Sequence, residues 1–421
     1  MTPCSYPKTV ILGLDGVGWS LIQRLIGEGI MPALAALMSE SVRGPMNSTW
    51  PDVSPVAWTT FFTGRPAAHH GIYGFTEFNP GGYEVRLNSS AEVKTPWLWD
   101  WLDLRGRRSV VLNVPLTYPA RPLAGVMVSG FVALDYDRAV HPAWVADFLR
   151  SIGYRLEADF ERVHTDRTAF LSDLDLALSG REKLMARFWP DDWDLFALVI
   201  TDTDRLLHFF YREYLEKGPI TGYFLDFFRR IDALVGRTVE LALRMAEKDR
   251  DLTLVMLSDH GFAPVETEFH LNRWLRAKGY QKEPLNEARV LALDPGRIYI
   301  NRPPRFPGGG VGGSEAERLK LELSAALAAE PAVFEVKDGD RLYSGPWAHL
   351  APDLVLRPRP GYELKAKFTA GPVYTSSLLM GGHCFDDAFY LIREFKAPSP
   401  LPEIEDILDL GRRLLARYGL Q

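Results

Sequence analysis

The sequence is poor in cysteine. Only two of its 421 residues are cysteines, Cys4 and Cys384, and they lie far apart in the chain. A disulfide framework requires several cysteines, and a zinc site built on cysteine requires them at close spacing. The sequence therefore excludes both kinds of structure.

The sequence also lacks a long apolar run and an excess of positive charge. The run Val10–Leu14 ends at Asp15 after five residues, and no run approaches the ~20 residues that a membrane-spanning helix needs. The formal net charge of -6 provides no broad basic surface for a nucleic-acid polymer, although it leaves room for a local basic pocket. We therefore expect a cytoplasmic protein whose partners include neither a membrane nor a nucleic-acid polymer.

What is present is an ordinary globular composition, with 47% hydrophobic and 24% charged residues. Short apolar runs alternate with segments of helical periodicity. The runs predict strands at 9–14, 109–114, 126–131, 195–200, 253–257 and 388–392. The periodic segments predict helices at 57–64, 97–104, 142–152, 166–188, 223–248 and 404–418. This alternation predicts an α/β fold with a mostly parallel central sheet and helices on both faces.

Residues 281–371 differ from the rest because they are rich in proline and glycine. This segment has its own predicted helix, in which Ser314 and Glu317 would form a capping box before residues 319–329. Short strands are predicted at 297–300 and 353–356. We therefore predict an inserted cap subdomain at 281–371 on a core formed by residues 1–280 and 372–421.

Acidic residues and histidines follow several of the predicted strands. Asp259 and His260 come directly after a strand that reads as buried on both faces, and ligands of open α/β sheets bind beyond such strand ends. Asp15 ends the first strand. Asp204 and His208 follow another strand at i and i+4, so a helical turn would place both on one face. Taken singly, each residue also fits a helix cap or a surface pair.

Two further residues extend this set. Asp202 is an alternative ligand on the segment of Asp204, and His383 follows two glycines, which allow the backbone to approach a site closely. A buried histidine bonded to a carbonyl is the simpler interpretation of His383. Together, three carboxylates and three imidazoles suit two divalent cations such as Zn²⁺ or Mn²⁺. Two cations ~4 Å apart stabilise an in-line displacement at phosphorus.

Ser54 is the best candidate for a nucleophile. It lies in a loop rich in turn formers, Pro51 to Pro55, before a predicted helix whose N-terminus would stabilise an anion. A nearby metal would lower the pKa of its hydroxyl, so no histidine base is required. The alternative is a serine that only stabilises a turn.

Five blocks, in order, resemble the type I phosphodiesterase/nucleotide pyrophosphatase branch of the alkaline phosphatase superfamily. The blocks are Leu12–Gly16, Pro51–Gly64 continuing to His70–Ile72, Asp204–His208, Ser258–Gly261 and Gly382–His383. The resemblance implies an alkaline-phosphatase-like sandwich. It also implies one metal ion held by Asp204, His208 and His383, and a second held by Asp15, Asp259 and His260 beside the Ser54 oxygen.

The sequence departs from the family pattern at two positions. Ala57 stands where nucleotide pyrophosphatases carry an asparagine that donates to the phosphate, which weakens the case for classical nucleotide specificity. Trp58 stands where sulfatases carry an arginine, which disfavours sulfate esters. Arg65 and Arg273 are candidates, by position alone, for the arginine that clamps a phosphate monoester.

We therefore predict a two-metal phosphohydrolase that acts on a small-molecule phosphate ester through a phospho-Ser54 intermediate. Zn²⁺ is favoured over Mn²⁺. A phosphodiester is the preferred substrate because no clamp for a dianionic monoester is evident. The alternatives are a phosphomonoesterase or phosphomutase on the same metals, and a metal-bound binding protein without catalysis. The predicted substrate contacts are Trp58, Tyr73, His270 and Arg273.

Overall fold

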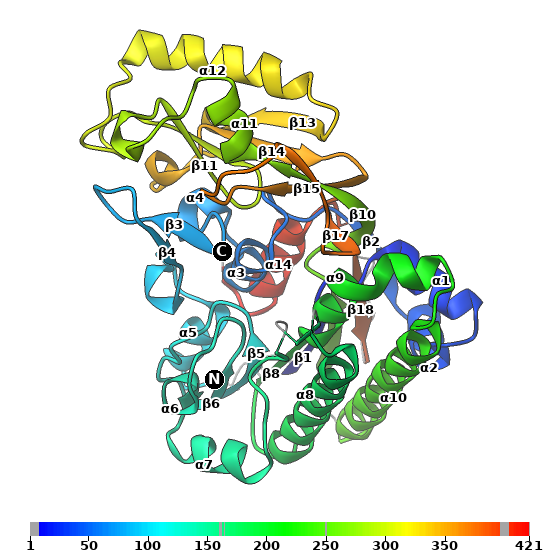
Figure 1. Cartoon of the computed structure of the whole chain (residues 1–421). Helices are drawn as coiled ribbons and strands as arrows, with labels where there is room; N and C mark the ends of the chain where they lie inside the picture. The colour runs from blue at the N-terminus through cyan, green and yellow to red at the C-terminus, as the bar shows by residue number, and fades with distance from the viewer. Residues whose placement is uncertain (1–7, 160–161, 164, 249–250, 396–403, 421) are drawn as a thin grey trace.

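A computed structural model describes residues 8–159, 162–163, 165–248, 251–395 and 404–420. Figure 1 shows a central sheet flanked by helices, with a second group of strands and one long helix, α12, on one side of it. Cys4 lies outside the described residues, and Cys384 is a free thiol. Among the described residues no single helix is long and apolar enough to cross a membrane, and one bent pair, Trp19–Gly27 with Pro32–Ser39, meets that test only jointly.

The central sheet has eight strands in the order β2-β18-β9-β1-β8-β5-β6-β7. Strands β9, β1, β8, β5 and β6 run parallel, while β18, β2 and β7 join their neighbours antiparallel. This confirms the predicted mostly parallel sheet. The strand bounds are β1 Lys8–Leu14, β2 Val42–Met46, β5 Ser109–Val114, β6 Gly125–Ser129, β7 Val140–His141, β8 Leu195–Ile200, β9 Leu252–Leu257 and β18 Ala388–Glu394.

Helices cover both faces of this sheet. Successive side chains of a strand point to opposite faces, so neighbouring strand residues pack into different apolar clusters. Val10 and Leu12 of β1 belong to one apolar cluster, and Ile11 belongs to another. The first cluster includes side chains of α1 Trp19–Gly27, α2 Pro32–Ser39, α7 Trp144–Ser151, α8 Arg167–Phe188, α9 Asp202–Leu215 and α10 Thr221–Ala246. The second includes side chains of α3 Ser54–Thr63, α4 Ala67–His70, α5 Leu98–Asp103 and α14 Ile407–Arg417.

A second group of strands packs beside the central sheet. Strand β10, Gly261–His270, pairs with β15 Gly361–Lys365, β16 Tyr374–Ser376 and β17 Gly381–Cys384. A four-stranded sheet contains β11 Val290–Leu293, β12 Arg297–Ile300, β14 Leu354–Pro358 and β13 Val333–Asp338, and β3 Thr76–Phe78 pairs with β4 Val85–Leu87. Helices α11 Leu271–Ala277 and α12 Gly313–Ala328 lie in this part. Elsewhere and here the chain also forms short helices, which are α6 Tyr136–Ala139, α13 Gly339–Leu342, η1 Ser90–Glu92, η3 Leu285–Glu287 and η4 Ala348–Leu350.

The apolar core of this second part extends beyond residues 281–371. Its cluster combines Leu319 and Leu323 of α12 with Phe269 of β10 and Trp274 of α11. The proline- and glycine-rich segment therefore shares its core with the chain that immediately precedes it.

The predicted cap of helix α12 is wrong. Helix α12 begins at Gly313 with Gly312 as its N-cap, so Ser314 lies inside the first turn and cannot form the predicted box with Glu317. Helix α5 begins at Leu98, one residue after its predicted start, and the carboxylate of Asp100 accepts a hydrogen bond from the backbone N–H of the N-cap residue Trp97.

Candidate metal and active site

Three adjacent parallel strands bring the predicted metal ligands to one edge of the sheet. Asp15 follows β1, and Asp259 and His260 follow β9. Asp204 lies in the first turn of α9, which begins directly after β8. Because β9, β1 and β8 are neighbours, their carboxyl ends place these side chains together. His208 lies one turn further along α9, as the i, i+4 spacing predicted.

One group of ligand atoms consists of Asp204, His208 and His383. The Oδ1 atom of Asp204 lies 3.4 Å from His208 Nε2 and 3.6 Å from His383 Nε2. The two Nε2 atoms are 3.2 Å apart. His383 comes from β17, far along the chain, and completes the group. This arrangement brings one carboxylate oxygen and two imidazole nitrogens to a common point.

A second group surrounds His260 and the hydroxyl of Ser54. His260 Nε2 lies 3.4 Å from Asp259 Oδ2, 3.8 Å from Asp15 Oδ1 and 4.0 Å from Asp204 Oδ1. Ser54 Oγ lies 3.3 Å from Asp15 Oδ1 and 3.5 Å from His260 Nε2. The Oδ1 atom of Asp204 thus belongs to both groups, a shared position that the sequence did not indicate.

The three imidazoles are oriented by backbone carbonyls. The Nδ1 atoms of His208, His260 and His383 lie 3.0 Å, 3.1 Å and 2.7 Å from the carbonyl oxygens of Gly381, Gly261 and Asp52, respectively. A proton on each Nδ1 satisfies its carbonyl and leaves the Nε2 lone pair facing the two groups. This is the tautomer in which histidine binds a metal ion.

Within the two ligand groups, two buried carboxylate oxygens have no hydrogen-bond partner among the described residues. They are Asp204 Oδ1 and Asp259 Oδ2, and both point into the groups just described. A buried oxygen without a partner is costly unless a cation or a donor compensates it. Mixed carboxylate and imidazole ligands suit Zn²⁺ or Mn²⁺, so the residues present fit a pair of divalent cations.

Burial and neighbouring charges shift the pKa values of the site's side chains. Burial raises the pKa of Asp259 to about 7. Burial together with the charges of Asp259 and Asp204 raises the pKa of Asp15 well above its usual range. Burial lowers the pKa of His208 to about 4, whereas the hydrogen bond and charge of Asp204 outweigh burial and raise the pKa of His383 to about 9. A pair of bound cations would stabilise the charged carboxylates and the neutral imidazoles.

Trp58 holds the carboxylate of Asp15 in place through a hydrogen bond. Its side chain is completely buried, and its Nε1–H donates to Asp15 Oδ2 at 2.9 Å. Gly13 leaves room for the indole, since a Cβ at that position would lie 2.4 Å from Trp58 Cη2. The carboxylate of Asp15 therefore has one oxygen fixed by Trp58 and the other facing Ser54.

The other residues that sequence analysis selected lie apart from the two ligand groups. The hydroxyl of Tyr73 donates to the carbonyl of Trp347 at 2.8 Å, and His270 Nε2 lies 2.8 Å from Thr375 Oγ1. Arg273 donates to the carbonyl oxygen of Pro372 at 2.9 Å. Asp202, the alternative ligand, pairs with the buried Arg181 at 3.3 Å.

Two cavities adjoin the ligand groups. The nucleophile cavity, of about 330 Å³, is lined by Asp15, Ser54, Phe75, Leu87, Pro115, Phe131, Val132, Thr201, Asp204, Arg205, His208 and His383. The cap cavity, of about 320 Å³, shares Phe75, Phe131, Arg205, His208 and His383 with it and extends to Asp294, Glu363 and Lys365. Trp58, Tyr73, His270 and Arg273 line neither cavity, so their predicted substrate contacts stay predictions.

Arg205 is a site residue that sequence analysis missed. Its Nη1 lies 3.5 Å from Asp204 Oδ2, and its guanidinium lies 4.4 Å from the centre of the Phe131 ring. It lines both cavities, whereas Arg65 and Arg273 line neither. Its position next to Asp204 in the Asp204–His208 block was the only available signal, and spacing alone could not show where the side chain points.

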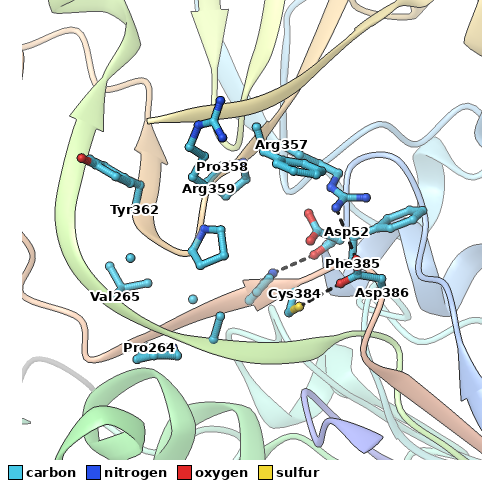
Figure 2. A pocket seen from close by; sticks show the side chains of 16 residues that line it. Asp52, Pro264, Val265, Arg357, Pro358, Arg359, Tyr362, Cys384, Phe385 and Asp386 are labelled. Atoms are coloured by element: carbon cyan, nitrogen blue, oxygen red, sulfur yellow. Dashed lines mark hydrogen bonds and ion pairs between the residues drawn. The ribbon is translucent and has the colours of Figure 1, made fainter. Parts of the chain in front are cut away.

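Figure 2 shows Arg357, an arginine of β14, beside Phe385 and Asp386. The Arg357 guanidinium lies 4.6 Å from the Phe385 ring and 5.5 Å from the Trp50 ring, and it pairs with Asp386 at 3.6 Å. Phe385 and Asp386 follow His383 in the chain, and Trp50 precedes Ser54. Arg357 therefore connects the segment that carries Ser54 with the segment that carries His383.

Comparison with known proteins supports this picture. The family pattern of "Type I phosphodiesterase / nucleotide pyrophosphatase" matches residues 9–380. A search of the curated proteins found no match.

Solved structures with the same fold cover almost the whole chain. Phosphonoacetate hydrolase from Sinorhizobium meliloti 1021, in complex with phosphonoformate, has a TM-score of 0.64 at 16% identity, covering 98% of this chain and 96% of that one. Inactive murine ectonucleotide pyrophosphatase/phosphodiesterase 5, in complex with AMP, has a TM-score of 0.59 at 14% identity, covering 99% and 96%. These likenesses confirm the alkaline-phosphatase-like fold.

Proposed function

Because the chain belongs to the type I phosphodiesterase/nucleotide pyrophosphatase family of the alkaline phosphatase superfamily, we propose that this phosphoric ester hydrolase is a two-metal phosphodiesterase with Ser54 as its nucleophile. The observation that carries the proposal is the position of Ser54 Oγ, 3.3 Å from Asp15 Oδ1 and 3.5 Å from His260 Nε2. The hydroxyl lies beside the second group of ligand atoms and opens onto the nucleophile cavity.

Asp204, His208 and His383 would hold one divalent cation, and Asp15, Asp259 and His260 the other, with Asp204 Oδ1 close to both. When bound, the cations would stabilise the charge that develops on phosphate oxygens. We favour Zn²⁺ over Mn²⁺ because three imidazoles are present.

The residues of the chain would orient the substrate and accept the phosphoryl group. Ser54 lies in the first turn of the ten-residue helix α3, whose N-terminal dipole favours an anion at that point. Ser54 Oγ would form a bond to phosphorus while the ester bond breaks, and the leaving alkoxide would take up a proton. Water would then cleave the Oγ–P bond and release a phosphate monoester.

A diester fits the charges of the nucleophile cavity better than a monoester does. Arg205 is the only arginine or lysine among the described residues that line it, and this arginine already lies close to Asp204 and Glu157. A singly charged diester needs fewer cationic partners than a dianionic monoester. The apolar walls also suit the organic groups of a small-molecule ester.

The test compares two aryl esters with the protein loaded with Zn²⁺ or Mn²⁺. We expect faster turnover of bis(p-nitrophenyl) phosphate than of p-nitrophenyl phosphate. We also expect Ser54→Ala to abolish turnover while metal content, measured by mass spectrometry, stays the same. A tenfold or greater preference for the monoester would favour a phosphomonoesterase or phosphomutase. Turnover of neither ester would favour a non-catalytic protein, and full activity of Ser54→Ala would refute the nucleophile.

A further inference from the structure

We propose that the cap cavity binds a hydroxyl group of the substrate through Glu363 and Lys365, so that the substrates are phosphodiesters of a small polyhydroxy alcohol. This proposal rests on the proposed function, because it assumes that the phosphorus lies next to Ser54. Both residues lie on β15, within the segment that the sequence singled out for its composition.

Glu363 and Lys365 are held in place by the sheet. Strand β15 pairs with β10 in parallel register, in which Glu363 lies opposite Glu268 and Lys365 opposite His270. Because the two residues are separated by one position, their side chains point to the same face. The carboxylate and the ammonium form an ion pair, with side chains only 18% and 20% exposed. Both line the cap cavity, together with His208 and His383.

The hydrogen bonding of this pair is incomplete. Oε1 of Glu363 accepts from Lys365 Nζ, but the buried Oε2 has no partner among the described residues. A buried acceptor without a partner destabilises the protein, and a ligand that donates to it recovers this loss. The ammonium of Lys365 has three N–H donors, so it can also donate to a ligand. The pair therefore offers one acceptor and one donor to the cavity.

A hydroxyl group matches both sides of this pair. It can donate to Glu363 Oε2 and accept from Lys365 Nζ at the same time. An ammonium group would meet the positive charges of Lys365 and Arg205 and has no lone pair to accept a hydrogen bond from Lys365 Nζ. A second anionic group would meet the carboxylates of Asp52 and Asp294, which line the same cavity, and would find Lys365 already neutralised by Glu363. The charges thus favour a neutral group with both a donor and an acceptor.

The size and position of the cavity limit the alcohol part of the substrate. Its volume of about 320 Å³ suits a small alcohol, and its shared wall with the nucleophile cavity includes Phe75 and Phe131. One molecule could therefore place its phosphorus beside Ser54 and its hydroxylated group beside β15. Glycerol and single sugar rings are alcohols of this class.

The test uses two substrates that differ only in their hydroxyl groups: the p-nitrophenyl diesters of glycerol phosphate and of propyl phosphate. The leaving group is the same, so the ratio of their kcat/KM values reports recognition of the alcohol. For the metal-loaded protein we expect a ratio of about 100 or more in favour of glycerol, since sites built to bind a hydroxyl discriminate strongly against its loss. In Glu363→Ala the ratio should fall to near one.

Two variants control for structural damage. Glu363→Ala leaves Lys365 without its partner, so the double change Glu363→Ala with Lys365→Met removes both charges, and its ratio should also be near one. Glu322→Ala removes a carboxylate of α12 that bonds the hydroxyl of Tyr280 and lines neither cavity, and its ratio should match the unchanged protein.

A binding measurement separates this proposal from the proposed function. With metal-loaded Ser54→Ala, calorimetry should show tighter binding of the glycerol diester than of the propyl diester, and Glu363→Ala should remove the difference. This result would support the alcohol site even if no ester is turned over. Equal binding of the two diesters, equal kcat/KM values, or a preference for the matching ethanolamine diester over the glycerol diester would overturn it.

Discussion

The indole of Trp58 gives Asp15 a fixed orientation, and this contact can be tested by removing a single N–H group. Trp58→Phe keeps an aromatic ring against Gly13 but removes the donor to Asp15 Oδ2. This hydrogen bond lowers the pKa of Asp15, so its loss makes the carboxylate a poorer ligand. We expect the affinity for Zn²⁺ to fall about tenfold or more, as for other residues that orient metal ligands.

A competition titration with a chromophoric chelator measures this affinity. Trp99→Phe is the matched control, because Trp99 stacks on Trp97 in the same apolar cluster without touching Asp15. If both variants bind Zn²⁺ equally well, Trp58 has only a packing role.

At the level of single residues, the sequence identified ligand types but not all side-chain directions. Asp15, Asp204 and Asp259 could be placed because strand ends of one parallel sheet meet at one edge. The role of Trp58 and the exposure of Arg205 to the cavities could not, because each depends on packing between segments that are distant in sequence. The same holds for Glu363 and Lys365.

Among the elements, α3 shows how a small error in a helix boundary matters for function. The sequence predicted this helix from residue 57, but it begins at Ser54 and ends at Thr63, with Gly64 as a C-cap in the left-handed conformation (φ 59°). Its start lacks the usual signal, since the N-cap is Val53 and no side chain caps the helix. As a result, Ser54 lies within the first turn of the helix itself and not in a loop before it.

Strand β14 contributes the second testable contact through Arg357. Arg357→Met would remove the charge that lies against Phe385 and Trp50 and the ion pair with Asp386. We expect a loss of about 1–2 kcal/mol in the free energy of unfolding, because each cation–π contact contributes about 0.5–1 kcal/mol. We also expect kcat to fall about tenfold, because misplacing the Ser54 and His383 segments weakens orientation of the reacting groups.

Arg359→Met is the matched control for Arg357→Met. Arg359 is exposed at the end of the same strand and lines the same small cavity as Arg357 (Figure 2). Denaturant unfolding and steady-state kinetics with an aryl diester should both be measured for the two variants. Equal kcat values for Arg357→Met and Arg359→Met would show that the contact with Trp50 and Phe385 does not position the site.

For the whole molecule, the predicted central sheet is confirmed, whereas the predicted domain boundary at residue 281 stays a prediction. The strands of the sheet are continuous apolar runs, which are visible without any tertiary information. The core around α12, in contrast, includes Phe269 and Trp274, which lie before the change in composition that suggested a boundary at residue 281. Composition marks where a chain changes character, whereas a shared core depends on long-range packing.

The crowding of carboxylates at the end of the sheet predicts how metal binding changes the stability of the whole protein. Asp15, Asp204 and Asp259 are nearly or completely buried and lie close to one another, so without cations they repel and lose hydration. A cation held by these three side chains would bind only the folded state, in which they lie together. At a free concentration of 100 times Kd, one bound ion should therefore add about 2.7 kcal/mol to the free energy of unfolding. Removing metal with a chelator should lower the Tm measured by calorimetry, and restoring Zn²⁺ should raise it again.

Asp259→Asn separates the effect of the Asp259 charge on folding stability from its effect on metal binding. The amide keeps an oxygen that can accept from the backbone N–H of Gly16, as Asp259 Oδ1 does at 3.1 Å, and it removes one of the clustered charges. The metal-free variant should therefore be at least as stable as the metal-free original, while its gain in Tm on adding Zn²⁺ should be much smaller. This combination is expected for a site whose clustered charges destabilise the metal-free fold but are needed to bind the metal. If Asp259→Asn instead lowered the Tm of the metal-free protein and left the response to Zn²⁺ unchanged, Asp259 would be a structural residue and not a ligand.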